Sequence, residues 1–326
     1  TRTNSKESVK YNKTYIKYIY VAISLSVIII AAIYYVPLIA QEIAWNNATR
    51  ENNIDSYNKY LEIYPEGEHS SSAIEKRDKC VKEYDKYFEN GNHLFNQDDF
   101  HGALREYSEA LRINPKSFGV IYNRGLVKAN MKDYIGAVND FTRAIEIEPK
   151  SSKSFTFRGS AKEALKDYTG AIDDYTKAIE IMPYNELAYV SRGVALYKQN
   201  KQNQAILDYK KVLEINPNNI TANNNMGWMS IDMKEYFYAT DYLSQAYRAD
   251  SVNIDILLGL SLCNYLKSDT ATAKNYLIKA IEVDERVKLG YSMIPLLEKE
   301  GYYYSGNQKK LLKELFGLLF TYLMLV

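Results

Sequence analysis

The sequence has few of the residues from which disulfide frameworks, metal sites and catalytic triads are built. Its 326 residues include only 2 cysteines and 3 histidines, too few for a disulfide-stabilised fold or a histidine-rich metal site. With 7 prolines and 15 glycines, chain breakers are also scarce, which favours long helices over many short strands. Lys+Arg number 41 against 40 Asp+Glu, a net charge of +1, so no global basic character indicates a nucleic-acid-binding protein.

Motifs for common catalytic and nucleotide-binding sites are also absent. There is no P-loop, GxGxxG or HExxH motif, and GLSLC at 259–263 lacks the final glycine of a nucleophile elbow. We therefore expect no enzymatic activity, no cofactor and no small-molecule substrate. The histidines are expected to be solvated rather than metal ligands, and the cysteines to be separate buried thiols: His69, His93, His101, Cys80 and Cys263.

One long uncharged segment lies near the N-terminus, from Ile19 to Ala40. As a helix its roughly 22 residues span about 33 Å, enough to cross a hydrocarbon core of about 30 Å. Tyrosines stand near both ends, as in the aromatic belts of membrane proteins. We expect a transmembrane helix at 18–40 that is kinked or ended by Pro37. A buried helix of a soluble protein and a cleaved signal peptide stay open, although no A-x-A cleavage site follows.

The flanks of this segment predict its orientation. Residues 1–17 contain five basic side chains and one acidic one, Glu7. The positive-inside rule makes them a cytoplasmic tail and puts everything after Ala40 on the outer side, the periplasm in a bacterium. An anionic lipid or a nucleic acid is an alternative ligand of this tail.

Several residue types recur every 34 residues. The ladders of glycine, alanine, proline and aromatic residues stay in phase: Gly91, Gly125, Gly159, Gly193 and Gly227; Ala103, Ala137, Ala171, Ala205, Ala239 and Ala273; Pro115, Pro149, Pro183 and Pro217; Tyr107, Phe141, Tyr175 and Tyr209. A fixed period of this length indicates stacked supersecondary units. We expect Gly159 to face Ala171 where two helices pack closely, Tyr175 to fill the space to the neighbouring unit, and Pro183 to end the second helix.

The order of these residues resembles the tetratricopeptide repeat family, most closely in YNRGLVKANMKDYIGAVNDFTRAIEIEPK and FRGSAKEALKDYTGAIDDYTKAIEIMP. The resemblance implies an all-α fold, a right-handed α-solenoid of helix hairpins preceded by one N-terminal transmembrane helix. It places six repeats at 84–117, 118–151, 152–185, 186–219, 220–253 and 254–287. The segment 41–83 is then an atypical half-repeat, and 288–326 forms C-terminal capping helices with an apolar tail.

The resemblance also implies a concave groove lined by the first helix of each repeat. The expected partner-binding positions are Phe88, Asn92, Tyr122, Asn123, Lys153, Thr156, Phe157, Leu187, Val190 and Tyr197, with Asp85, Val194 and Asn224 beside them. Some family members clamp a C-terminal carboxylate with two Lys, two Asn and one Arg. Here Asn92, Asn123 and Lys153 match three of those positions, while Phe88 and Phe157 replace a Lys and the Arg. Without that Arg a bidentate contact is lost, so we expect a peptide groove rather than a carboxylate clamp.

Two further ladders suggest ion pairs between the helices of each repeat. Arginines and aspartates recur at the same 34-residue step: Arg124, Arg158 and Arg192; Asp140, Asp174 and Asp208. We expect them to pair within each hairpin, with an anion-binding stripe as the alternative. Within 41–83, Pro65 is expected to end one helix and Ser70–Ser72 to cap the next, which runs to about Gln97.

The last twelve or so residues are almost wholly apolar, which is unusual for a solenoid cap because a cap has a polar outer face. We expect 315–326 to be covered by a partner, by a second copy or by a further segment, with a membrane-dipping tail as the alternative. Together these features predict a single-pass membrane scaffold that binds a protein or peptide partner and belongs to a membrane complex. Two alternatives stay open: the sensor or docking half of a larger signalling enzyme or receptor whose catalytic domain precedes Thr1, and an import receptor whose repeats face the cytosol.

Overall fold

A computed structural model describes residues 5–299 and 304–323 of the chain. Within this part the fold is all-α, and it divides into two compact units, Thr1–Asp133 and Tyr134–Val326. The first unit holds α1 (Ser5–Glu51), α2 (Ile54–Ile63), α3 (Ser70–Asn96), α4 (Phe100–Ile113) and α5 (Phe118–Asn130).

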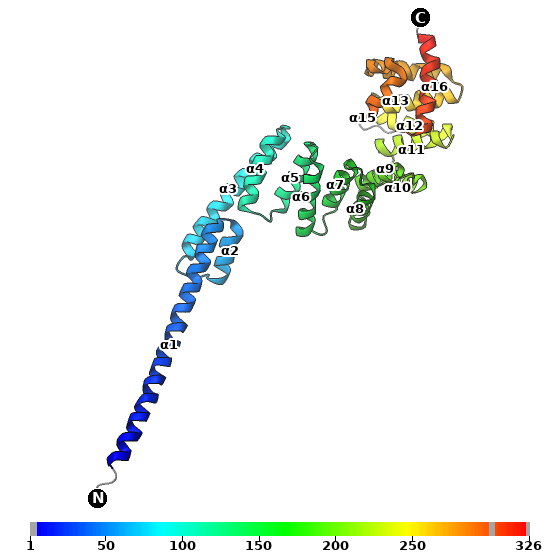
Figure 1. Ribbon diagram of the computed structural model, residues 1–326. Coiled ribbons are helices and arrows are strands. Elements are labelled where there is room, and N and C mark those ends of the chain that lie inside the picture. Colours follow the sequence, from blue (N-terminus) through cyan, green and yellow to red (C-terminus); the bar gives the residue numbers. More distant parts are fainter. Residues whose placement is uncertain (1–4, 300–303, 324–326) are drawn as a thin grey trace. The chain divides into compact units, whose positions relative to one another are not determined.

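The second unit begins with five helices and continues through two further hairpins to the C-terminal helices. Its elements are α6 (Tyr134–Ile147), α7 (Ser152–Ala164), α8 (Tyr168–Ile181), α9 (Glu186–Lys198), α10 (Gln202–Ile215), α11 (Ile220–Asp232), α12 (Tyr236–Ala249), α13 (Ile254–Leu266), α14 (Thr270–Val283), the 3₁₀ segment η1 (Glu285–Met293), α15 (Ile294–Lys299) and α16 (Gly306–Leu323). Consecutive helices pack on each other along this unit, which is the arrangement of a solenoid (Figure 1).

Helix α1 is one continuous helix that includes the apolar segment (Figure 1). It passes through Pro37 without ending, so of the two expected effects of Pro37, a kink or an end, the end was wrong. A proline removes a single helical hydrogen bond, and the helical residues on both sides keep the rest of the ladder intact. From Tyr15 onward the helix contains a window of mean hydropathy 2.4, none of it buried. It is long and apolar enough to cross a membrane, and no other part of the described chain packs over this window.

The end of α1 packs against the α2–α3 hairpin. Gln41 donates to the Tyr60 hydroxyl at 3.2 Å, and the Trp45 ring stacks on His69 at 4.8 Å. Helix α3 starts at Ser70, but its N-cap is His69 without a side-chain cap bond, so the serines do not cap it. The Ser70 hydroxyl instead donates to the carbonyl of Tyr64 at 2.7 Å and ties α3 to the preceding turn. The half-repeat is thus held to the long helix by aromatic contacts.

Three hairpins close over a tyrosine ring that lies directly on a glycine, and in the α11–α12 hairpin Leu243 takes the place of the ring. A Cβ added to Gly159 would lie 2.7 Å from Cε1 of Tyr175, and one added to Gly193 would lie 2.6 Å from the same atom of Tyr209. Tyr175 therefore fills the space inside its own hairpin, and it also packs in one cluster with Ala195 of the next unit, as expected. Glycine is needed here because the ring occupies the volume of a side chain.

We expect Gly193→Ala to lower the free energy of unfolding by about 1–3 kcal/mol, because overpacking against Tyr209 outweighs the gain of about 1 kcal/mol in helix propensity. Gly317→Ala is the matched control, since its added Cβ meets no atom within 4 Å and should slightly stabilise α16. Urea unfolding of both variants measures the difference. Two variants of equal or raised stability would contradict the packing role of the glycine.

The turns inside the hairpins follow the same period. A non-glycine residue with positive φ stands at each of six positions 34 residues apart: Asp98, Lys132, Lys166, Asn200, Lys234 and Ser268. This left-handed residue ends the first helix of the hairpin, and several of the following residues cap the second helix, as Asp167 does by accepting from the N–H of Gly170 at 2.9 Å. The same turn geometry is thus repeated in every hairpin of this set, although the residue type at the turn varies.

The expected Arg–Asp pairs are confirmed in two hairpins. Arg158 makes a bidentate contact with Asp174 at 2.9 and 2.7 Å, and Arg192 makes the same contact with Asp208 at 2.9 and 2.7 Å. Each arginine also reaches the preceding hairpin through a threonine, with the Arg192 Nη1 atom 3.0 Å from the Thr176 hydroxyl. The hydrogen bond to Asp208 raises the pKa of Arg192. The pairs therefore link successive repeats as well as the two helices of one repeat.

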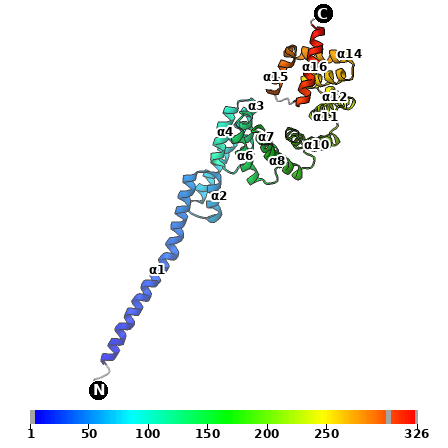
Figure 2. The ribbon, with the colours of Figure 1, turned by 45° about the vertical axis from the view of Figure 1, so that its right-hand side comes forward.

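The C-terminal helix α16 covers the inner side of the last two hairpins. It contacts α11 and α13, the first helices of these hairpins, and both ribbon views show it beside them (Figures 1 and 2). Its side chains Leu312, Leu315 and Phe316 are buried in the same core as Leu258 and Leu262 of α13. Helix α13 carries buried apolar side chains on all sides, since α16 covers the side that other repeats leave open. The rest of the apolar tail, from 318 onward, lies outside the described side chains.

Candidate functional site: a pocket on the first helices of the last repeats

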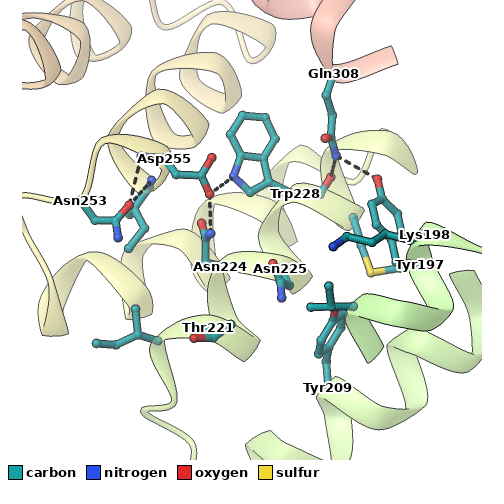
Figure 3. A pocket seen from close by; sticks show the side chains of 14 residues that line it. Tyr197, Lys198, Tyr209, Thr221, Asn224, Asn225, Trp228, Asn253, Asp255 and Gln308 are labelled. Atoms are coloured by element: carbon teal, nitrogen blue, oxygen red, sulfur yellow. Dashed lines mark hydrogen bonds between the residues drawn. The ribbon is translucent and has the colours of Figure 1, made fainter. Parts of the chain in front are cut away.

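A cavity of about 280 Å³ lies within the second unit (Figure 3). Its walls come from α9, α10, α11 and α13 and from the start of α16. The lining residues combine an apolar wall with amide, hydroxyl and charged groups: Val194, Tyr197, Lys198, Tyr209, Ile220, Thr221, Asn224, Asn225, Trp228, Met229, Asn253, Asp255, Ile256 and Gln308. An apolar cavity with a few converging polar groups is the usual form of a ligand site.

Asp255 lies at the inner end of this pocket, in the first turn of α13. Its Oδ2 atom accepts hydrogen bonds from Nδ2 of Asn224 and, at 3.0 Å, from Nε1 of Trp228 (Figure 3). Burial raises the pKa of Asp255, and these hydrogen bonds act in the opposite direction. The carboxyl group is thus held in place by neutral donors, two of which come from the neighbouring helix α11.

The same contacts leave one acceptor unused. The Oδ1 atom of Asn224 is buried and accepts no hydrogen bond from the described residues. Trp228 is fixed from its other side by the ring of Tyr304, edge to face at 5.1 Å. A buried acceptor without a donor costs about 1–3 kcal/mol, so a ligand that supplies a donor here gains affinity.

The start of α16 closes one side of the pocket. Ser305 and Gln308 form a capping box, with Ser305 N–H donating to Oε1 of Gln308 at 2.9 Å and Gln308 N–H donating to Ser305 Oγ at 3.0 Å. The Gln308 amide then donates to the Trp228 carbonyl and to Asp232, each at 3.0 Å. Asp232 also accepts from Ser305 and from the hydroxyl of Tyr197. This network fixes the wall of the pocket.

The outer rim carries one cation that is already paired. Lys198 donates to Glu163 at 2.9 Å, and its side chain is 24% exposed. Thr221 is exposed at the opening, and Asn253 caps α13 through its side chain. The polar groups of the pocket that could bind a ligand are therefore hydroxyl, amide and carboxyl groups.

Replacing Asp255 with asparagine is expected to remove a pH-dependent loss of stability. Because the folded-state pKa lies above the ordinary value of 3.8, the folded chain binds this proton more tightly than the unfolded chain does. Stability therefore falls as the pH rises from about 4 through the folded-state pKa, and the deficit persists above it. The variant should melt at a higher temperature at neutral pH. Melting temperatures of both proteins from about pH 4 to pH 8 test this, and equal slopes would contradict it.

The groove residues expected in the first unit form hydrogen bonds to each other or stack on neighbouring aromatic rings. Asn92 accepts from Nδ2 of Asn123 at 2.8 Å and from the Tyr107 hydroxyl at 2.7 Å, so the structure brings the two asparagines together. Phe88 stacks on Tyr84, and Tyr122, whose ring stacks on Phe118, has its pKa raised to about 12 by burial. Asp85 is exposed.

In the second unit only part of the expected set meets at the pocket. Tyr197 lines it, as do the flanking positions Val194 and Asn224. Lys153 and Leu187 are exposed and lie outside its lining, whereas Val190 packs against the core of the α9–α12 region. The remaining two residues lie in helix packing rather than at a free surface: Thr156 is 1% exposed and bonded to Ser152 and Asn185, and Phe157 stacks on Phe141.

Sequence reasoning missed Asp255, Trp228 and Gln308. Asp255 occupies the same position of the 34-residue period as Lys153 and Leu187. The period could therefore have indicated Asp255 as a further groove position. The expected positions included Asn224 of the fifth repeat but no residue of the sixth. Gln308 lies beyond the period, and nothing repetitive in the sequence predicts its contact with α11.

The structure also locates the residues set aside as non-catalytic. Both cysteines are buried and free, as expected; burial raises the pKa of each thiol, to about 12 for Cys263. Across residues 5–299 and 304–323, no group of histidine, cysteine and acidic side chains is arranged to hold a metal ion. The thiols are therefore unreactive core residues.

Three sequence models from one family match the chain. Models described as "Tetratricopeptide repeat" match residues 118–151 and 187–219, and one described as "TPR repeat" matches residues 159–200. No curated protein matches the sequence.

Solved structures with the same arrangement of helices include pilF of Pseudomonas aeruginosa, at a TM-score of 0.59 and 18% identity over 68% of this chain and 99% of that one. A tetratricopeptide repeat protein from Parabacteroides merdae gives 0.53 and 17% over 72% and 99%. The Cut9–Hcn1 hetero-tetramer of APC/C gives 0.54 and 16% over 71% and 49%. At these identities the likeness concerns the fold, and it confirms the all-α solenoid.

Proposed function

Because the chain is a tetratricopeptide repeat protein, we propose that it is a non-catalytic scaffold that binds a segment of a partner protein in the pocket of its second unit. The observation on which this depends is the pocket itself, which joins the apolar wall of Val194, Ile220 and Met229 to the amides of Asn225 and Asn253. The amides can hydrogen-bond the main chain of a bound peptide, and the apolar wall can contact its side chains.

The proposal includes a membrane anchor at α1. Support comes from the exposed apolar window after Tyr15, its flanking tyrosines and the basic residues of 1–17. Anchoring confines the scaffold to two dimensions and raises the effective concentration of a partner at the same membrane. In this arrangement the repeats lie on the outer side, and the scaffold is a subunit of a membrane-associated complex.

A photo-crosslinker at Thr221 tests the pocket as the binding site. Thr221 is exposed and lines the pocket, whereas Asp241 is exposed on α12 and does not line it. In native membranes we expect a discrete crosslinked product from position 221 and none from the matched position 241. A product from both positions, or from 241 alone, would place the partner elsewhere.

Cysteine labelling tests the orientation. Both native cysteines are buried, so an exposed Lys210→Cys on α10 is the reporter site. In sealed vesicles of known orientation, a membrane-impermeant maleimide should label this position only from the outer side. Labelling from the cytoplasmic side would favour an import-receptor arrangement.

A further inference from the structure

The inner end of the pocket has more hydrogen-bond acceptors than donors. Asp255 receives the neutral N–H groups of Asn224 and Trp228, with the neutral hydroxyl of Tyr304 beside them, and the side-chain oxygen of Asn224, Oδ1, has no donor among the described residues. Asp232, on the wall beside Gln308, is likewise held by neutral hydroxyl and amide groups. Neither aspartate forms an ion pair with any residue that the structure describes.

The one basic side chain in the lining does not balance these carboxyl groups. Lys198 points its ammonium group to Glu163, with which it forms a neutral pair. The charge left at the pocket is therefore negative whenever Asp232 or Asp255 is ionised. A cation placed here would replace the missing counter-charge, and the low dielectric of the buried site would strengthen its interaction.

From this arrangement we infer that the pocket binds a basic side chain of the partner, arginine in preference to lysine, with its cationic group at Asp255. The inference rests on the proposed function and names the chemistry of the partner. A cavity of about 280 Å³ lies at the small end of ligand pockets, so it accepts one side chain and not a folded element.

Arginine suits the distribution of polar and apolar groups. Its guanidinium presents five N–H donors in a plane, which can serve Asp255 and Oδ1 of Asn224 together, whereas an ammonium group has three donors. The aliphatic stem of the side chain would pack against Ile220 and Ile256 on the pocket wall.

The chain contains a built-in reporter for this binding. It has 2 tryptophans, so Trp45→Phe leaves Trp228 as the single tryptophan, and the Nε1 atom of Trp228 donates a hydrogen bond to Asp255. We would titrate this protein with N-acetyl-arginine amide and, as the matched uncharged probe, with N-acetyl-citrulline amide. The same titrations on Asp255→Asn remove the charge with little change of shape, and Asp241→Asn controls for the loss of an exposed acid.

We expect saturable binding of the arginine probe, weakened about ten- to hundredfold by citrulline or by Asp255→Asn and unchanged by Asp241→Asn. Lysine amide should bind more weakly than arginine amide. Equal binding of the arginine and citrulline probes, unchanged binding by the Asp255 variant, or no saturable binding would overturn the inference. The Asp255 variant is expected to be more stable than the parent, so a loss of binding does not report unfolding.

Crosslinking at Thr221 separates this inference from the proposed function. If the crosslinked partner persists in Asp255→Asn at the same yield, the scaffold function stands. The inference that the partner places a basic side chain at Asp255 is then wrong. If the arginine probe binds as expected but no protein crosslinks, the cation chemistry stands and the ligand is a free guanidinium compound rather than a partner protein.

Discussion

Asp174→Asn is expected to lower the free energy of unfolding by about 3 kcal/mol. The Asp174 side chain is 5% exposed and is shared by the bidentate Arg158 and by Lys162 at 2.7 Å. Removing its charge leaves two cations facing each other in a largely buried site. Breaking a buried pair costs about 3–5 kcal/mol, and we expect the low end because Arg158 and Lys162 are 17% and 23% exposed.

Asp173→Asn is the matched control, because it removes the same charge from the neighbouring exposed position. Urea unfolding should show little change for Asp173→Asn and a large shift for Asp174→Asn. A double-mutant cycle with Arg158→Met would then give a coupling energy of about 1.5–3 kcal/mol. A coupling energy near zero would mean that the Arg158–Asp174 pair does not stabilise the fold.

The repeat period predicted much of the second unit. It predicted the Arg158–Asp174 and Arg192–Asp208 pairs, because residues of one ladder are brought to equivalent positions whenever every unit folds alike. It could also have predicted Asp255, which continues the position of Lys153 and Leu187. The residue type at this position changes from one repeat to the next, so the period indicates where a binding residue lies but not its chemistry.

Features outside the period were not predictable in the same way. Gln308 reaches Trp228 and Asp232 across about 80 residues of sequence, and such a contact leaves no local pattern. The left-handed turns at Lys166, Asn200 and Ser268 were missed for the opposite reason. They are periodic in backbone conformation, yet the ladder mixes lysine, asparagine, aspartate and serine, so no single residue type marks the turn in the sequence.

The uniform apolarity of α13 and the amphipathic first half of α16 explain each other. Seen alone, IDILLGLSLCNYL has no polar side, and the C-terminal stretch from Leu315 looks like an uncovered surface. Together they form one core, in which Leu312, Leu315 and Phe316 lie against the inner side of α13. The expectation that a partner covers this stretch is therefore unnecessary at Leu315 and Phe316, which this chain covers itself.

Leu312→Ala tests this covering role and is expected to cost about 2–5 kcal/mol, because Leu312 is fully buried and its loss leaves a cavity. The exposed Lys310→Ala on the same helix should change stability by less than about 0.5 kcal/mol. Since α16 also brings Gln308 to the pocket, the leucine variant should expose Trp228 and shift its fluorescence to the red at low urea, before the rest of the unit unfolds. If the two variants unfold alike and Trp228 stays shielded, then α16 is dispensable, and the inner side of α13 must be covered by something other than this helix.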